Sequence, residues 1–290
     1  MEFTRQFLRA KNPCADGFRW FSRHVQDGSG YQEALDTLVA AGRVEDACWL
    51  LTQFGPTQAV LAVDAIDADA LVFAGTLDVR GNIDVGSVIH VGGAIRVAGG
   101  LRGGGNITAG GDIRVAGSLQ AQGNVHVGGD LRADWGAEVQ GSMTCHGELR
   151  VAWDLLCGAG FSVRGSAFIG QDFLAQGAVD CGKGLRVGAQ LTGRAGVRAA
   201  QGILVGAGIA SAGHLEAGWG IKAGEGMHAL GSIKAGETLS AGQDIRAGAG
   251  YGVFAGLDVP VDAWAAGGQV WSPECPDGLR SGVWMGPRTL

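Results

Sequence analysis

The sequence predicts a mainly β fold, a single-stranded β-solenoid (β-helix) of hexad repeats, from three observations. From Leu71 to Leu257 every sixth residue is apolar, without insertion or deletion. The residue two positions later is small or β-branched and the one between is mostly polar, the alternation of a very short strand. The other three positions are rich in glycine, which can supply the positive φ of a sharp corner. Such a unit cannot bury its own apolar face, so successive units must coil and stack.

The number of hexads per turn decides the cross-section of the coil. Three hexads give a triangular turn of 18 residues, and two give a flattened turn of 12. Similar strings on an 18-residue lattice favour the triangle over the first half, and these strings occupy residues 94–97, 112–115, 130–133, 148–151 and 184–187. In the C-terminal part a 12-residue recurrence leaves the count open, at residues 221–224, 233–236 and 245–248.

Composition and charge bound the classes of function. The chain has 54 glycines among 290 residues, but its 46% of hydrophobic residues stand in strict register, unlike a disordered tract. The net charge is −6, and no basic tract suits nucleic acid. No apolar run approaches the roughly 18 residues of a membrane span, and the N-terminus lacks the order of a signal peptide. A cytoplasmic location without membrane contact is therefore expected.

Residues 1–58 are predicted to form a helical cap. The six-residue period is absent there, and helical spacing predicts short helices over residues 2–9, 16–25, 31–41 and 44–54. A group of this size is too small to stand alone. An uncovered solenoid end exposes strand edges, so these helices are interpreted as covering the first turn of a solenoid that spans residues 59–257. An independent binding module is the alternative interpretation.

Within the solenoid, a row of outward basic residues is the pattern with most chemical content. If the turn has 18 residues, five arginines lie on one face and can receive carboxylates bidentately, namely Arg96, Arg114, Arg132, Arg150 and Arg186. The alternative interpretation is a face kept soluble by long polar side chains. The first interpretation makes these arginines candidate partner-binding residues.

Residues 258–290 form the predicted C-terminal cap. Three tryptophans, Trp264, Trp271 and Trp284, flank a turn-rich centre over residues 272–278, a pattern that predicts a hairpin with a proline-stiffened loop. The tryptophans either plug the last turn or anchor a partner, since tryptophan and arginine are enriched at binding hot spots.

No catalytic or metal site is expected from the sequence. The histidines occupy different positions of the repeat, so no three are expected to meet at one metal ion. Cys145, Cys157 and Cys181 fall on inward positions, where a thiol serves as a small apolar filler. The lattice leaves no long loop to form a pocket. We therefore expect no enzyme, no cofactor and no small-molecule substrate, with a hexapeptide-coil enzyme as the weaker alternative.

Two resemblances bear on function. The string of residues 12–21, Asn-Pro-Cys-Ala-Asp-Gly-Phe-Arg-Trp-Phe, resembles a signature that heads bacterial proteins similar to immunity partners of interbacterial toxins. It implies a non-catalytic protein that binds and neutralises a toxin effector. The glycine-rich hexads resemble bactofilin-type polymer-forming proteins, which implies a structural scaffold as the alternative. The predicted caps favour the first, because a polymer needs open ends.

Overall fold

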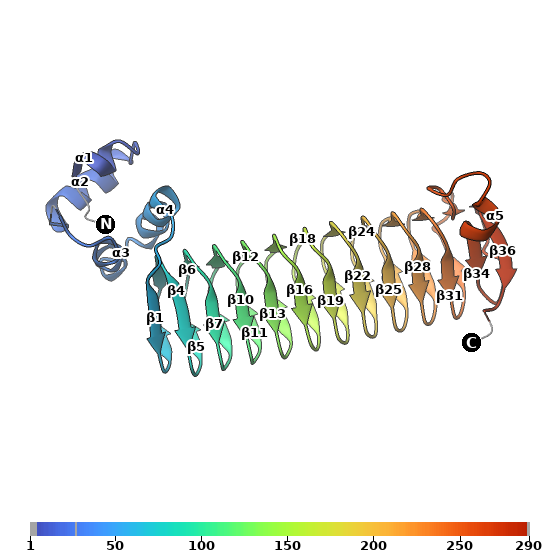
Figure 1. The fold of residues 1–290 in the computed structure, drawn as a ribbon, viewed down its shortest axis with the longest axis horizontal. Helices are drawn as coiled ribbons and strands as arrows, with labels where there is room; N and C mark the ends of the chain where they lie inside the picture. Colours follow the sequence, from blue (N-terminus) through green and yellow to red (C-terminus); the bar gives the residue numbers. More distant parts are fainter. Residues whose placement is uncertain (1–4, 27, 289–290) are drawn as a thin grey trace.

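The computed structural model describes residues 5–26 and 28–288, which form a long rod of stacked coils with a group of helices beside its N-terminal end (Figure 1). Each regular coil gives one strand to each of three parallel sheets. Successive coils align 18 residues apart, with Ile95 beside Ile113 and Ile203 beside Ile221. The triangular β-solenoid is thus confirmed, and the 12-residue turn is wrong for the C-terminal part as well.

We number the sheets by their first strand. Sheet 1 contains β1 (Val60–Val63), β4 (Thr76–Val79), β7 (Ile95–Val97), β10 (Ile113–Val115), β13 (Leu131–Ala133), β16 (Leu149–Val151), β19 (Ala167–Ile169), β22 (Leu185–Val187), β25 (Ile203–Val205), β28 (Ile221–Ala223), β31 (Leu239–Ala241), β34 (Gln269–Trp271) and β36 (Val283–Gly286). Sheet 2 contains β2 (Ile66–Ala68), β5 (Ile83–Val85), β8 (Leu101–Gly103), β11 (Leu119–Ala121), β14 (Ala137–Val139), β17 (Leu155–Cys157), β20 (Phe173–Ala175), β23 (Leu191–Gly193), β26 (Ile209–Ser211), β29 (Met227–Ala229) and β32 (Ile245–Arg246). Sheet 3 contains β3 (Leu71–Phe73), β6 (Ile89–Val91), β9 (Ile107–Ala109), β12 (Val125–Val127), β15 (Met143–Cys145), β18 (Phe161–Val163), β21 (Val179–Cys181), β24 (Val197–Ala199), β27 (Leu215–Ala217), β30 (Ile233–Ala235), β33 (Val253–Phe254) and β35 (Leu279–Ser281).

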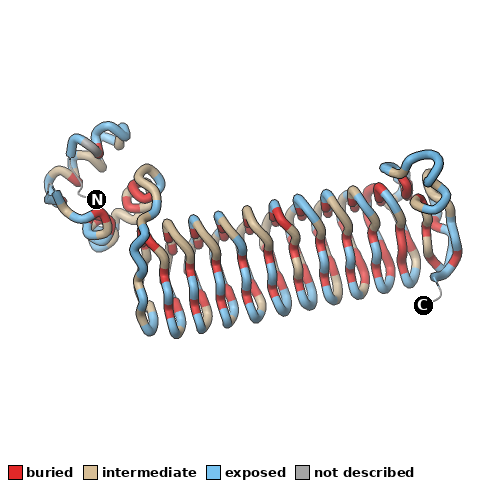
Figure 2. The backbone as a smooth tube through the Cα atoms, in the orientation of Figure 1, coloured by how far each residue is buried: buried red, intermediate tan, exposed pale blue. Residues whose placement is uncertain are grey.

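The core is a continuous column inside the coil. In β10, Ile113 and Val115 are buried and Arg114 between them is exposed, and the same alternation recurs along the rod (Figure 2). Phe161 and Phe173 meet edge to face inside the coil, with ring centroids 4.7 Å apart. The inward cysteines are buried as predicted, and burial raises the pKa of the Cys157 thiol to about 12. The hexad lattice therefore encodes the inside of the coil directly.

Glycine is required at the corners of the coil for a different reason than the one the sequence suggests. Among the described residues, those with positive φ lie in the helical segment or after Ile245, and none is a corner between β1 and β32. Instead, a Cβ atom placed on Gly188 would lie only 1.9 Å from the carbonyl oxygen of Gly170 in the coil below. Close stacking of successive corners, rather than a left-handed backbone, makes glycine necessary there.

The regular register ends at Ile245, not at Leu257. Tyr251 and Leu257 are 52% and 51% exposed, whereas the lattice places both inside. Val253 is buried instead of these two residues, and it pairs with Ile233. It follows a turn in which Gly250 has a φ of +81°. The prediction is wrong for these two residues because the extra turn shifts the chain relative to the lattice.

The C-terminal tail closes the coil without a hairpin. After a short helix α5 (Trp264–Gly267), strand β34 pairs in parallel with β31, and β36 in turn pairs in parallel with β34. Strand β35 adds in parallel to β33. The expected strands form, but each one extends an existing sheet, because the last regular strands offer edges that must be covered.

The predicted N-terminal helices are α1 (Arg5–Arg9), α2 (Ala15–His24), α3 (Tyr31–Ala40) and α4 (Val44–Phe54). Residues 2–4 of the first expected helix lie outside the described residues. Helices α3 and α4 bury Leu35, Leu38 and Leu50 between them and pack on Val72 and Ala74 at strand β3. The helices therefore contact sheet 3, and they form a small core separate from that of the coil.

Candidate protein-binding face

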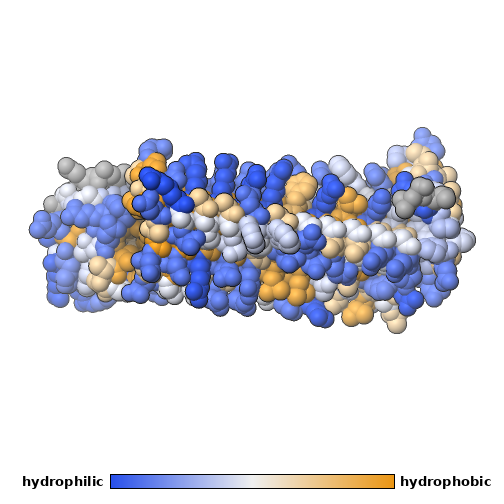
Figure 3. Space-filling view, turned by 90° about the horizontal axis from the view of Figure 1, so that it is seen from below, coloured by the Kyte–Doolittle hydropathy of each residue, from blue (hydrophilic) through white to orange (hydrophobic). Residues whose placement is uncertain are grey.

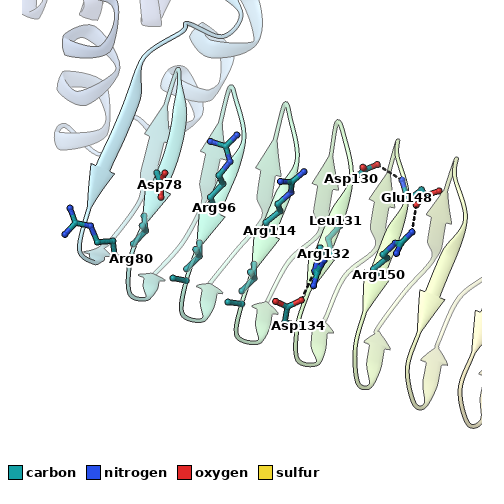
Figure 4. A pocket seen from close by; sticks show the side chains of 15 residues that line it. Asp78, Arg80, Arg96, Arg114, Asp130, Leu131, Arg132, Asp134, Glu148 and Arg150 are labelled. Atoms are coloured by element: carbon teal, nitrogen blue, oxygen red, sulfur yellow. Dashed lines mark hydrogen bonds and ion pairs between the residues drawn. The ribbon is translucent and has the colours of Figure 1, made fainter.

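The predicted arginine row exists on the outer face of sheet 1. Arg96 lies beside Arg114, which is followed by Arg132 and Arg150 on successive strands (Figure 4). Phe168 then interrupts the row, and Arg186 follows it. Beyond Arg186 the same row continues with Leu204, Lys222, Ser240 and Trp271. The five predicted arginines therefore share one face.

In the N-terminal half of this face, up to Arg150, carboxylates already engage three of the arginines. The distance from Arg114 Nη2 to Asp112 Oδ2 is 3.3 Å, and that from Arg132 Nε to Asp134 Oδ1 is 2.7 Å. Arg150 pairs with Glu148 at 3.2 Å. These pairs are exposed, so each contributes about 0–1 kcal/mol of stability and can be displaced.

The carboxylates on this half are also held by the backbone. Asp112 Oδ1 accepts the N–H of Asp130 at 3.0 Å, and Asp130 Oδ1 accepts the N–H of Glu148 at 2.8 Å. The groove on this half has a volume of about 730 Å³ and is lined by four carboxylates, those of Asp78, Asp130, Asp134 and Glu148, against five guanidinium groups, those of Arg80, Arg96, Arg114, Arg132 and Arg150. This half is therefore close to neutral.

The C-terminal half of the face, from Phe168 to Trp271, has a different chemistry. Two grooves of about 420 Å³ and about 590 Å³ run along it, and their described lining includes no carboxylate. The cations Arg186, Lys222 and Arg288 lie among half-buried Phe168 and exposed apolar side chains. The exposed apolar residues are Leu204 and Trp219. This half is cationic and apolar at once.

Within the described part of the chain, two arginines of the row, Arg96 and Arg186, have no ion pair. Arg150 also stacks over Phe168, with its guanidinium carbon 5.0 Å from the ring centroid. Arg186, with apolar neighbours on both sides in the row, is therefore the guanidinium best placed to receive a carboxylate from another molecule.

The three tail tryptophans do not form one patch. Trp271 joins the row and has Arg288 5.8 Å from its ring. Trp284 is exposed at β36 and donates its Nε1–H to Ser272 O at 3.1 Å. Trp264, in α5, packs against Gly256 and Gly268. Only Trp271 belongs to the face that carries the arginines.

Sequence reasoning missed Phe168, Leu204 and Trp219 as site candidates. Phe168 and Leu204 carry a readable signal, because the middle residue of a strand triplet is mostly polar and these two are apolar. A stacked pair of exposed tryptophans, Trp135 and Trp153, stands at another corner, with ring centroids 6.3 Å apart. On the side of the rod seen in Figure 3, hydrophobic patches interrupt rows of hydrophilic side chains.

Some of the histidines lie close to one another. The rings of His126 and His146 meet edge to face, with their centroids 4.9 Å apart. The pKa of His90 is lowered, mainly by burial and to a smaller extent by the charge of the nearby His126. Among the described residues no group of three or more His, Cys, Asp or Glu side chains is placed to hold a metal ion. The absence of a metal and of a cofactor stays a prediction.

A membrane-spanning helix is not found in the described part of the chain, where no helix combines sufficient length with sufficient apolar character.

Comparison with known proteins gives one family. The model described as YdhT N-terminal domain matches residues 1–54, so the helical segment is similar to that domain. Neither the curated proteins nor the solved structures gave a match. The match covers the helices and stops before strand β1.

The signature over residues 12–21 lies inside that match, and its residues have structural roles. Asn12 takes a φ of +52° before α2, and Cys14 Sγ accepts the N–H of Gly17 at 3.2 Å as the helix cap. A Cβ on Gly17 would lie 3.0 Å from that sulfur. Trp20 stacks on His24, and Phe21 is buried. The signature is accounted for by the fold of the helical segment.

Proposed function

We propose that this chain is a non-catalytic, protein-binding β-solenoid that holds its partner along the outer face of sheet 1. The observation that supports this most is the change along that face, from a nearly neutral N-terminal half to a C-terminal half with three cations, exposed apolar side chains and no lining carboxylate among the described residues. A rigid coil presents such a surface without an ordering cost, which favours tight binding.

The partner in this proposal is a toxin effector, which the chain neutralises as an immunity protein in the cytoplasm. The resemblance carried by residues 12–21 supports that identity. An acidic segment with apolar side chains suits the C-terminal half, where Arg186 and Lys222 flank Leu204 in the row. The proposal makes Arg186 and Trp271 the leading partner-binding residues, ahead of Arg114, Arg132 and Arg150, whose charges are already paired.

A toxicity-rescue assay with the product of the neighbouring open reading frame tests this function. We expect the double variant Arg186→Glu with Lys222→Glu to lose rescue and to lose capture of the effector. The matched control, Arg114→Glu with Arg132→Glu, reverses the same number of charges on the neutral half and should keep both. Thermal denaturation of each variant shows whether the coil is intact. Equal rescue by the two double variants contradicts the proposal.

A second candidate function is a scaffold that assembles end to end. One observation favours it, because the first coil is not fully covered by the helices, and Val60 in strand β1 is 60% exposed. The predicted scaffold would appear as filaments of the purified protein in electron micrographs. Discrete particles at the same concentration would leave the binding function as the better account.

A further inference from the structure

The first coil has three strand edges, and the helices close only one of them. Strands β1, β2 and β3 each begin a sheet. At β3, the Gln32 side chain closes the edge, since its Nε2 donates to Val72 O at 3.0 Å and its Oε1 accepts the N–H of Ala74 at 2.9 Å. Thr57 N–H donates to Ala74 O at 2.8 Å as well. The edge of sheet 3 is therefore satisfied by α3 and the linker.

Among the described residues, strands β1 and β2 have no comparable cover. Along a strand, the backbone N–H and C=O groups of successive residues face opposite sides. The groups that face away from β4 and β5 belong to Val60, Ala62 and Asp67, and all three residues are exposed. In the described residues, the helix contacts of this coil concentrate on β3. The outward N–H and C=O groups of β1 and β2 thus face solvent, as at the end of any open sheet.

The core is also open at this end. Leu61, Val63 and Ile66 point inward but are only half-buried. Their partners in the next coil, Leu77, Val79 and Ile83, are fully buried. A further strand laid on β1 would cover apolar surface as well as satisfy backbone groups.

The charge of this end selects the kind of strand. Residues 59–75 contain Asp64, Asp67 and Asp69 and no lysine or arginine, and all three carboxylates are exposed. Arg80, in the next coil, pairs with Asp64 at 3.2 Å. A second copy docked through the same end would bring three more carboxylates against these, and like charges in adjacent strands destabilise pairing. A basic segment would be attracted instead.

We propose that the uncovered N-terminal end of the coil binds an extended, basic segment of a protein partner, which adds to β1 as a new edge strand. Its backbone pairs with Val60 and Ala62, its apolar side chains cover Leu61 and Val63, and its lysine or arginine side chains reach Asp64 and Asp67. Strand addition of this kind draws affinity from backbone hydrogen bonds and specificity from alternate side chains. This site is distinct from the outer face of sheet 1.

The test uses the full chain and a fluorescent peptide of alternating valine and lysine, with a valine and glutamate peptide as its acidic counterpart. We expect saturable binding of the basic peptide alone, weakening between about 0.05 M and about 0.5 M salt. Ala62→Pro removes the outward N–H at an edge position where proline is tolerated, and should weaken binding roughly tenfold. Asp64→Asn with Asp67→Asn should do the same by removing charge.

The control is Asp180→Asn, which removes an exposed carboxylate from the middle of the rod. Binding that falls as much in this control as in Asp64→Asn with Asp67→Asn, or that survives both Ala62→Pro and the double variant, overturns the proposal. Self-association of the wild-type chain through this end, seen by sedimentation and abolished by Ala62→Pro, also overturns it in favour of a second copy. Arg186→Glu with Lys222→Glu should bind the peptide normally, which separates this proposal from the proposed function.

Discussion

The two ends of the coil are finished in different ways. At the C-terminal end the chain itself continues, adding β34 and β36 to sheet 1 and β35 to sheet 3, so that Val253, Ala255 and Val270 are fully buried. At the N-terminal end a separate helical group sits on sheet 3, and the inward residues of β1 stay half-buried. At the C-terminal end, strands of the same kind as the coil extend two of the three sheets, whereas at the N-terminal end the described residues leave the edges of β1 and β2 uncovered.

The largest effect that distinguishes the two ends is expected from a buried charge. Val270→Asp places a carboxyl in a closed interior and should destabilise the C-terminal coils by on the order of 4 kcal/mol, because such a group is desolvated without a partner. Leu61→Asp at the open end should cost only about 1–2 kcal/mol, since water reaches the site. Denaturation with hydrogen exchange localises each effect. Equal costs at the two ends would mean that the N-terminal end is closed as well.

The second prediction concerns the single side chain that closes an edge at the N-terminal end. Gln32→Ala leaves Val72 O and Ala74 N–H without their side-chain partners and should cost about 1–3 kcal/mol, mostly as weaker docking of α3 on β3. The control is Thr37→Ala on the exposed side of the same helix, where the hydroxyl only donates to Glu33 O. Hydrogen exchange at Ala74 should accelerate in the first variant alone.

How far the sequence predicts each region follows from the same contrast. The interior was predictable because inward residues recur every six positions and each strand triplet alternates, as in Ile113, Arg114 and Val115. The arginine row followed from the same lattice. The ion pair between Arg114 and Asp112 could also be predicted, since the two residues stand two positions apart in the sequence.

The two ends of the coil were not predictable in the same way, because their structure depends on which segments lie beside the exposed strand edges. Nothing local separates Gln32 from other polar residues of α3, and its role exists only once β3 lies beside it. Tyr251 fits an apolar lattice, yet the turn at Gly250 shifts the chain so that Val253 takes the inward place. The proline-rich tail is equally compatible with a hairpin and with a corner of the coil. The open edges of β31 and β33 favour the corner, because strands of the tail pair with them.

The third prediction uses alkaline pH to loosen the N-terminal end. Burial raises the pKa of Tyr31 from its ordinary value of 10.0 to about 12, and its hydroxyl donates to Gly55 O at 3.1 Å. The unfolded chain loses this proton near pH 10 and the folded chain does not, so the stabilising contribution is complete below pH 10 and disappears as the pH rises to about 12.

Burial, assisted by Glu45, also raises the pKa of Cys48 to about 11, so the reference variant is Tyr31→Phe with Cys48→Ala. Helical circular dichroism should fall between pH 10 and 12 in the wild type and much less in this variant. The buried thiols of the coil are common to both proteins and cancel in the difference. Identical pH profiles would place the alkaline weakness in the coil rather than in the helical segment.

The smallest effect is expected from a single aspartate at the open end. Asp67 lies directly opposite Asp84 on the next strand, and like charges in that position oppose each other. Asp84 is in turn 3.5 Å from Arg102, and these side chains are exposed, so the net repulsion is weak. Asp67→Asn should therefore stabilise the first coil by no more than about 0.5 kcal/mol, and the gain should vanish in high salt. Denaturation at low and high salt measures it, with Asp180→Asn as the control. A clear loss of stability would mean that the Asp67 carboxylate holds the coil end together, whereas a small gain would mean that this charge is kept at a slight cost to the fold, as expected of a carboxylate that selects what may pair with strand β1.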